Sequence, residues 1–94
     1  MPMTTEDLQP LVGYRARLWR FMATHDHLAI RLEPKTQDRV VFLVLSGCNH
    51  LGLPVAWEVR APRVEIADPP WLLLVDEGVR VVCRDISLHD DYPW

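Results

Sequence analysis

Hydrophobic and polar residues alternate with a period of two through most of the chain, and this pattern predicts strands. The alternation is clear at residues 28–33, where the apolar residues Leu28, Ile30 and Leu32 occupy every second position. Successive side chains of a strand point to opposite faces of a sheet, so this spacing gives one apolar face. No stretch shows a convincing 3.6-residue period, and we therefore expect an all-β fold.

The segment 14–23 begins with the same alternation and then slips by one residue at Trp19 and Arg20. A β-bulge, which inserts one residue into a strand, would turn both Leu18 and Phe21 inward and leave Arg20 outside. A short polar stretch at residues 24–27 separates this segment from the next strand. Together the two segments predict a β-hairpin.

Four further strand segments and one loop follow. Residues 40–45 are apolar at both parities, which is typical of a strand covered on both faces, so we expect this strand to be central. Residues 46–54 contain two glycines and a proline and predict a loop. Residues 55–60 alternate again, and the apolar parity switches after Pro62, which indicates a bent strand or two short strands. Residues 71–75 and 79–88 predict the last two strands, joined by a three-residue turn in which Gly78 takes the left-handed position.

The whole pattern predicts about six mostly antiparallel strands in a single domain, residues 1–94, arranged as a small barrel or a two-sheet sandwich. A helical turn is expected at residues 4–8 within an N-terminal arm, residues 1–12, and residues 89–94 form a polar tail. A β-rich α+β fold is the alternative. The predicted core consists of Leu18, Phe21, Leu28, Ile30, Leu32, Val40, Phe42, Val44, Trp57, Val59, Leu73, Val75, Val81 and Cys83.

Composition narrows the function classes. Ten basic residues against thirteen acidic ones give a net charge of −3, so nucleic acid is not an expected partner. The longest apolar run, residues 40–45, is far shorter than the roughly 20 residues that cross a bilayer. The first residues are acidic where a secretory signal needs basic ones, and we expect a cytoplasmic protein without a membrane partner. In that reducing compartment Cys48 and Cys83 are expected to be separate thiols.

Metal-ligand residues gather in the polar segments. If successive strands alternate in direction, the segments 24–27, 46–54 and 76–78 share one end of the domain. That end would hold His25, His27, Cys48 and His50, and one thiolate with three imidazoles is a tetrahedral ligand set that suits Zn²⁺. A zinc site at these four residues is the alternative functional hypothesis, while the preferred interpretation includes no cofactor.

The preferred interpretation is a non-enzymatic domain that binds another protein, because the sequence carries no catalytic spacing or cofactor motif. Three aromatic residues are candidates for the interaction surface: Trp71, which follows two prolines, and Tyr92 and Trp94 in the tail. Unpaired strand edges favour association with a second copy, so a homodimer is expected in preference to a monomer.

Overall fold

The computed structural model describes residues 3–23, 26–35, 39–68 and 70–90. Within them it has one helix, α1 (Thr5–Leu8), a 3₁₀ turn, η1 (Gln9–Leu11), and nine strands. The strands are β1 (Arg15–Met22), β2 (His27–Glu33), β3 (Val41–Ser46), β4 (His50–Gly52), β5 (Ala56–Glu58), β6 (Arg63–Ile66), β7 (Leu72–Asp76), β8 (Val79–Cys83) and β9 (Asp85–His89). The predicted all-β fold with a short N-terminal helical turn is therefore confirmed.

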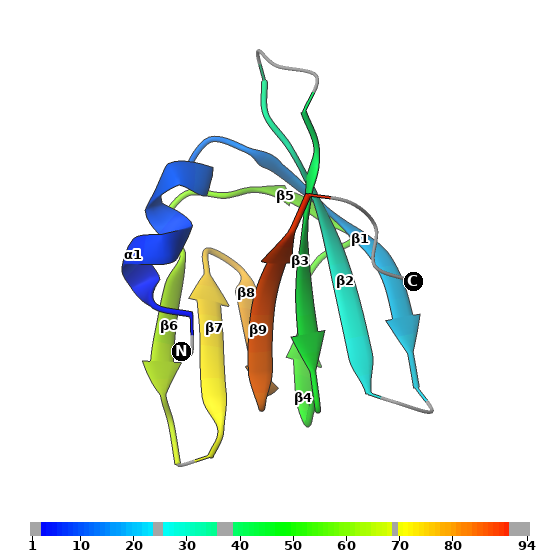
Figure 1. Cartoon of the computed structure of the whole chain (residues 1–94), viewed down its shortest axis with the longest axis vertical. Coiled ribbons are helices and arrows are strands. Elements are labelled where there is room, and N and C mark those ends of the chain that lie inside the picture. The colour runs from blue at the N-terminus through cyan, green and yellow to red at the C-terminus, as the bar shows by residue number, and fades with distance from the viewer. Residues whose placement is uncertain (1–2, 24–25, 36–38, 69, 91–94) are drawn as a thin grey trace.

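The strands form two antiparallel sheets (Figure 1). One has the order β5-β1-β2-β3-β9 and the other the order β4-β8-β7-β6. Ile30 and Leu43 of the first sheet and Leu74 and Val81 of the second belong to one buried cluster. The core therefore lies between the sheets, and the described strands form a two-sheet arrangement, not a closed barrel.

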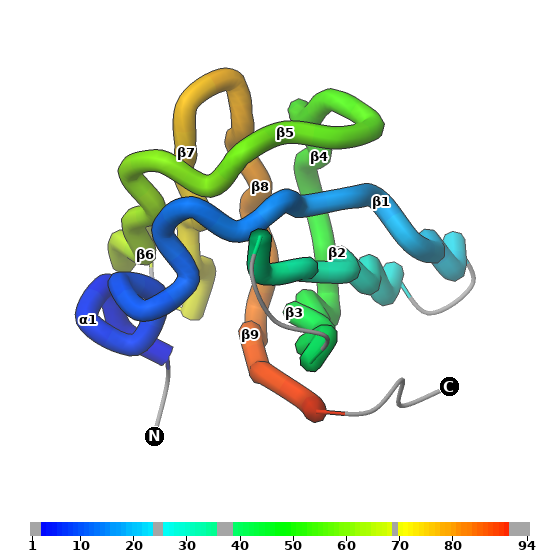
Figure 2. Tube along the Cα trace, turned by 90° about the horizontal axis from the view of Figure 1, so that it is seen from above, coloured from blue at the N-terminus to red at the C-terminus, as the bar shows by residue number. Residues whose placement is uncertain are grey.

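The structure has nine strands where about six were expected, because the segments 55–66 and 79–88 each divide between the two sheets and the predicted loop 46–54 contains β4. The chain leaves the five-stranded sheet after β3 and after β5, and returns to it after β4 and after β8. Figure 2 shows β5 beside β1 before the chain continues to β6. The parity switch after Pro62 thus marks two short strands in different sheets. The expectation of one strand at residues 79–88 was wrong, because the segment bends at Arg84.

The predicted hairpin of β1 and β2 is confirmed, including its bulge. Leu18 pairs with Ile30 and Arg20 with Ala29, so Trp19 is the extra residue. The prediction that Phe21 belongs to the core was wrong, because its side chain is 43% exposed. Phe21 shares the inner face with its partner Leu28, but it lies on β1 beyond the residues that pair with β5.

The predicted facing of β7 was also wrong. Leu72, Leu74 and Asp76 are buried, whereas the predicted core residues Leu73 and Val75 are only half-buried. A run that is apolar at both parities does not reveal which face is inner. The inner face of β7 is the one that carries Asp76, whose carboxylate accepts part-buried hydrogen bonds from the Ala61 and Glu77 backbone N–H groups.

The other core predictions are confirmed in part. β3 is central, between β2 and β9, as expected. Phe42 and Val44 are buried but lie opposite Arg31 and Ala29, on the face that points away from the other sheet. Leu18, Val40 and Trp57 are half-buried. The remaining predicted core residues are buried: Leu28, Ile30, Leu32, Val59, Val81 and Cys83.

Helix α1 covers part of the edge of β6. The Thr5 hydroxyl donates to the Val64 carbonyl oxygen at 3.2 Å and accepts from the Val64 N–H at 3.0 Å. Thr4 is the N-cap, and its backbone N–H donates to the Asp7 carboxylate at 2.8 Å. The Thr5 hydroxyl thus satisfies two backbone groups of the β6 edge, which would otherwise be open to pairing with another chain.

Candidate functional site

The segment between β3 and β4 lies beside the turn that joins β1 and β2. The Cys48 N–H donates to the Asp26 carbonyl oxygen at 3.0 Å, and Asp26 has a left-handed backbone with φ of 52°. Part of the predicted gathering of polar segments is therefore present. The expectation of one continuous loop at residues 46–54 was wrong, because the segment contains β4.

The turn at residues 76–78 does not join this group. Figure 1 shows the β7–β8 turn at about mid-height on the left, away from the lower right, where β1 ends and β2 begins. The prediction assumed straight strands that alternate in direction. Three segments instead bend from one sheet into the other, so turns that alternate along the chain need not share an end.

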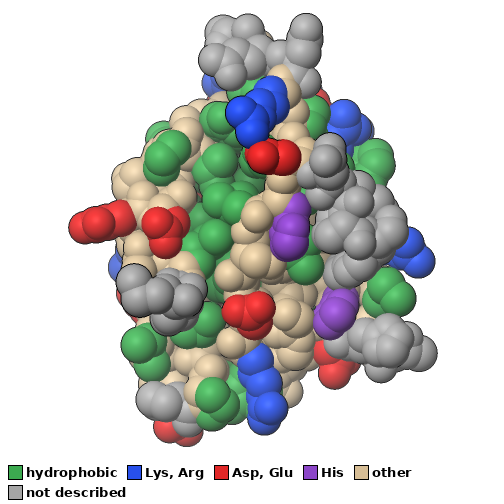
Figure 3. Space-filling view, in the orientation of Figure 1, with side chains coloured by type: hydrophobic (Ala, Val, Ile, Leu, Met, Phe, Trp, Pro, Cys, Tyr) green, Lys and Arg blue, Asp and Glu red, His purple; other side chains and the backbone are tan. Residues whose placement is uncertain are grey.

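The predicted zinc ligands are not assembled among the described residues. His27 begins β2 and is half-buried, and His50 begins β4 opposite Val82 and is exposed. No group of three or more His, Cys, Asp or Glu side chains that could hold a metal occurs in the described ranges. Figure 3 shows the histidine side chains of one face lying apart from each other. His25 lies outside the described residues, so the four-ligand hypothesis stays a prediction.

Both thiols are protonated at neutral pH. Burial, together with the negative charge of Asp26, raises the pKa of Cys48 to about 11. Burial, then the neighbouring Cys48, raises the pKa of Cys83 to about 12. The Cys48 S–H donates to the Leu45 carbonyl oxygen at 3.6 Å. Because the thiolate is the form that attacks an electrophile or ligates a metal, the raised pKa makes Cys48 slow to react and a poor metal ligand at neutral pH.

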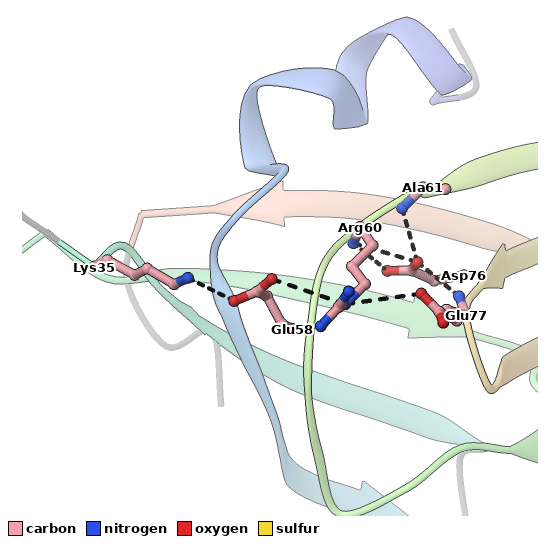
Figure 4. Close-up of polar contacts among 6 residues, drawn as sticks. All are labelled: Lys35, Glu58, Arg60, Ala61, Asp76 and Glu77. Atoms are coloured by element: carbon pink, nitrogen blue, oxygen red, sulfur yellow. Dashed lines mark hydrogen bonds and ion pairs between the residues drawn. The ribbon is translucent and has the colours of Figure 1, made fainter.

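Asp76 holds together two segments that are distant in the sequence (Figure 4). Its carboxylate accepts from the Arg60, Ala61 and Glu77 backbone N–H groups, at 3.3, 3.0 and 2.7 Å. These contacts fasten the corner between β5 and β6 to the β7–β8 turn. The sequence places Asp76 in a turn, and the Asp-Glu-Gly order was the available signal for a side chain that bonds to nearby backbone.

A chain of charged side chains crosses the surface beside Asp76. Glu58 lies 2.6 Å from Lys35 and 3.8 Å from Arg60, and Arg60 lies 3.7 Å from Glu77 (Figure 4). The hydrogen bond from Lys35, and then its charge, lowers the pKa of the Glu58 carboxyl group. These side chains are exposed to solvent, which screens their attraction, so they contribute little to stability or binding.

The aromatic candidates for an interaction surface fall in different places. Trp71 is half-buried, and the Arg84 guanidinium lies 5.0 Å from its ring centroid, so Arg84 covers part of the ring. Tyr92 and Trp94 lie outside the described residues.

The free end of β1, residues 20–22, is the surface that the sequence did not reveal. Pairing of β1 with β5 covers only Arg15, Ala16 and Arg17, and the last backbone bond on this side runs from the Leu18 N–H to the Val55 carbonyl oxygen. Pro54 comes next and has no N–H to donate. Among the described residues, nothing pairs with residues 20–22 on this side.

Exposed apolar side chains accompany the free end of β1. Val55 is 71% exposed and Phe21 is 43% exposed. Both lie on the core-facing side of their sheet, since Val55 stands beside Leu18 and Phe21 opposite Leu28. Unpaired backbone and an uncovered apolar face therefore occur at one place.

Two hollows lie elsewhere on the molecule. An apolar cavity between α1 and the two sheets, lined by residues such as Leu8, Leu11 and Trp57, has a volume of about 30 Å³. That volume corresponds to about one water molecule and leaves no room for an organic substrate. An open groove of about 460 Å³ lies between the N-terminal residues and β6, where Ile66 is 69% exposed.

Comparison with protein-family models, with curated proteins and with solved structures finds no match to this chain. In the described part of the chain, no helix has the length and apolar character needed to cross a bilayer. Functional inference therefore rests on the physical properties of the surfaces described above.

Proposed function

We propose that this chain is a non-enzymatic domain that binds another protein by strand addition at the free end of β1. The observation that carries the proposal is that residues 20–22 extend β1 beyond its pairing with β5. An unpaired strand edge offers backbone donors and acceptors to an incoming extended segment, which is a recurring mode of protein recognition.

The side chains at this edge suit a protein partner. An added strand would continue the line of β5 and place its alternate side chains beside Phe21 and Val55, which are exposed and apolar. Its other side chains would lie near Arg20, for which no ion pair occurs in the described structure. Backbone pairing would then supply affinity, and the apolar contacts would supply specificity.

A second copy of the chain is the first partner to consider. Two free β1 ends related by a twofold axis would pair with each other as antiparallel strands, because such an interface presents the same patch on both subunits. Light scattering should then give twice the chain mass of 10.9 kDa. A monomer at tens of micromolar would exclude self-pairing and direct the proposal to a foreign protein.

Affinity capture with matched variants tests the proposal. In Phe21→Lys a charged side chain on the free edge opposes strand addition, whereas Ile66→Lys makes the same change on β6, at the other exposed groove. We expect Phe21→Lys, but not Ile66→Lys, to lower the captured amount of at least one protein, or of the second copy, about fivefold or more. A loss of this size is typical of a residue central to an interface. Equal capture by both variants and wild type would contradict the proposed surface.

Zinc binding is the competing function, and it predicts a different result. If His25, His27, Cys48 and His50 bind zinc in the folded state, the metal at 100 times its dissociation constant adds about 2.7 kcal/mol of stability. His50→Ala would abolish the rise in melting temperature. The proposed interaction domain requires no response to zinc in wild type or variant.

A further inference from the structure

The two cysteines lie on adjacent backbone segments where the chain passes between the sheets. At this corner the Arg84 N–H donates to the Ser46 carbonyl oxygen at 3.0 Å, and the Asn49 N–H donates to the Val82 carbonyl oxygen at 2.8 Å. Between these two bonds lie Gly47 and Cys48 on one side and Cys83 alone on the other. Cys48 and Cys83 are therefore cross-strand neighbours, although they are 35 positions apart in the sequence.

Both side chains also lie on the core side of the corner. Cys83 is fully buried in the cluster between the sheets, and Cys48 is half-buried and packs against the same cluster. The charge of the Cys48 thiolate contributes to the raised pKa of Cys83, which is a second sign of their closeness. Opposed residues of antiparallel strands have Cα atoms about 4.5 to 5.5 Å apart, within the range that a disulfide spans.

We propose that Cys48 and Cys83, which are free thiols in the structure, form an intramolecular disulfide on reaction with a small-molecule disulfide. The bond would tie the β3–β4 corner to the β8–β9 corner and so link the two sheets covalently. This cross-link is a modification site independent of the free end of β1.

The reaction proceeds by two thiol–disulfide exchanges. Cys48, the more accessible thiol, loses its proton and attacks one sulfur of glutathione disulfide, which releases one glutathione thiolate and leaves a mixed disulfide on Cys48. Cys83 then loses its proton and attacks the Cys48 sulfur, and the second glutathione leaves. The two protein thiols lose two electrons, the glutathione disulfide gains them, and the two released protons yield two glutathione thiols.

The pH dependence of the rate follows from the first step. Because the pKa of Cys48 is raised to about 11, only a small fraction of the thiol is ionised at neutral pH. The initial rate should therefore rise about tenfold for each pH unit between pH 7 and pH 9. A thiol with an ordinary pKa would begin to level off near pH 9 instead.

Intact-mass measurement of the folded full chain after incubation with glutathione disulfide tests the proposal. We expect a product lighter than the reduced protein by two hydrogen atoms, a proteolytic peptide pair joined through Cys48 and Cys83, and no dimer on a non-reducing gel. Because the cross-link closes a long loop in the unfolded chain, the melting temperature should rise by at least about 5 °C.

Single variants separate the two steps. Cys83→Ala should stop at a stable glutathione adduct on Cys48, and Cys48→Ala should not react while folded. If Cys83→Ala fails to fold, Cys48→Ala and the joined wild-type peptides still decide the result. The proposal is overturned if folded wild type keeps its reduced mass or stops at an adduct, while the same protein in denaturant forms the disulfide.

Discussion

Asp76 shows how one buried carboxylate can organise two distant segments. It is the only charged side chain in the described structure that is buried, and three backbone N–H groups donate to it. Without the carboxylate these three part-buried donors would lose a charged acceptor, and bonds to a charged group contribute more than those between neutral groups. The residue therefore has a structural role that fixes the β5–β6 corner.

Substitution of Asp76 should be among the most destabilising polar changes in this domain. We expect Asp76→Ala to lower the free energy of unfolding by about 2 to 4 kcal/mol, because bonds to a charged acceptor are lost. Asp76→Asn keeps one oxygen acceptor and should cost roughly half as much. Glu77→Ala, at the exposed neighbouring position, is the control and should cost less than about 0.5 kcal/mol in urea denaturation.

The two thiols predict a loss of stability at alkaline pH. Their pKa values in the folded state, about 11 and about 12, lie above the value of 9.0 for an unperturbed thiol. As pH rises, the unfolded chain therefore releases these protons first. The contribution of the two thiols to the free energy of unfolding is fully present below pH 9 and is lost as pH rises through their pKa values in the folded state.

Urea denaturation at pH 8 and pH 10 under reducing conditions measures this effect. Wild type should lose at least about 1 kcal/mol more than the double variant Cys48→Ala, Cys83→Ala, after allowance for solvent screening at Cys48. An equal loss in both proteins would mean that the thiols ionise alike in the folded and unfolded states.

Among the elements, the corners decide how the sheets are joined. Gly47 has a left-handed φ of +64°, and a Cβ there would lie 3.1 to 3.3 Å from the Cβ, Cγ and Cδ atoms of Arg84. Arg84 is itself held beside Trp71. The β3–β4 corner thus needs glycine both for its backbone and for the close approach of the β8–β9 corner.

A comparison of Gly47 with Gly78 separates the requirement for a positive φ from the requirement for close packing. Gly78 also has a positive φ, +74°, but no atom lies within 4 Å of a Cβ built there. We expect Gly78→Ala to cost about 1 to 2 kcal/mol for the backbone alone, and Gly47→Ala to cost about 1 kcal/mol more. Equal losses in thermal or urea denaturation would show that Arg84 moves aside freely.

Most elements could be predicted from the sequence because their pattern is local. The Trp19 bulge, the central position of β3 and the glycine turn at Gly78 each follow from alternation or turn chemistry within a few residues. The facing of β7 could not be predicted, because Leu72 to Val75 are apolar at both parities and a distant backbone segment binds Asp76.

In the molecule as a whole, the observed arrangement differs from the expected one because three segments bend from one sheet into the other. The pattern predicts about six strands where the structure has nine, and it contains no signal for the corners at residues 47–49 and 84, so it misplaces the turn at residues 76–78. The free end of β1 was missed for the same reason. It depends on where β5 stops pairing, and that is a contact between segments some 40 residues apart along the chain.

The proposed function requires a partner protein to add a strand at the free end of β1. Hydrogen–deuterium exchange of the domain, alone and bound to the second copy or the captured protein, tests it most directly. Amides that join a new backbone ladder become protected from exchange. We predict that protection on binding appears at residues 20–22 and extends toward Val55, whereas β6 is unchanged. Unchanged exchange at residues 20–22, with protection confined to another surface, would contradict the claim.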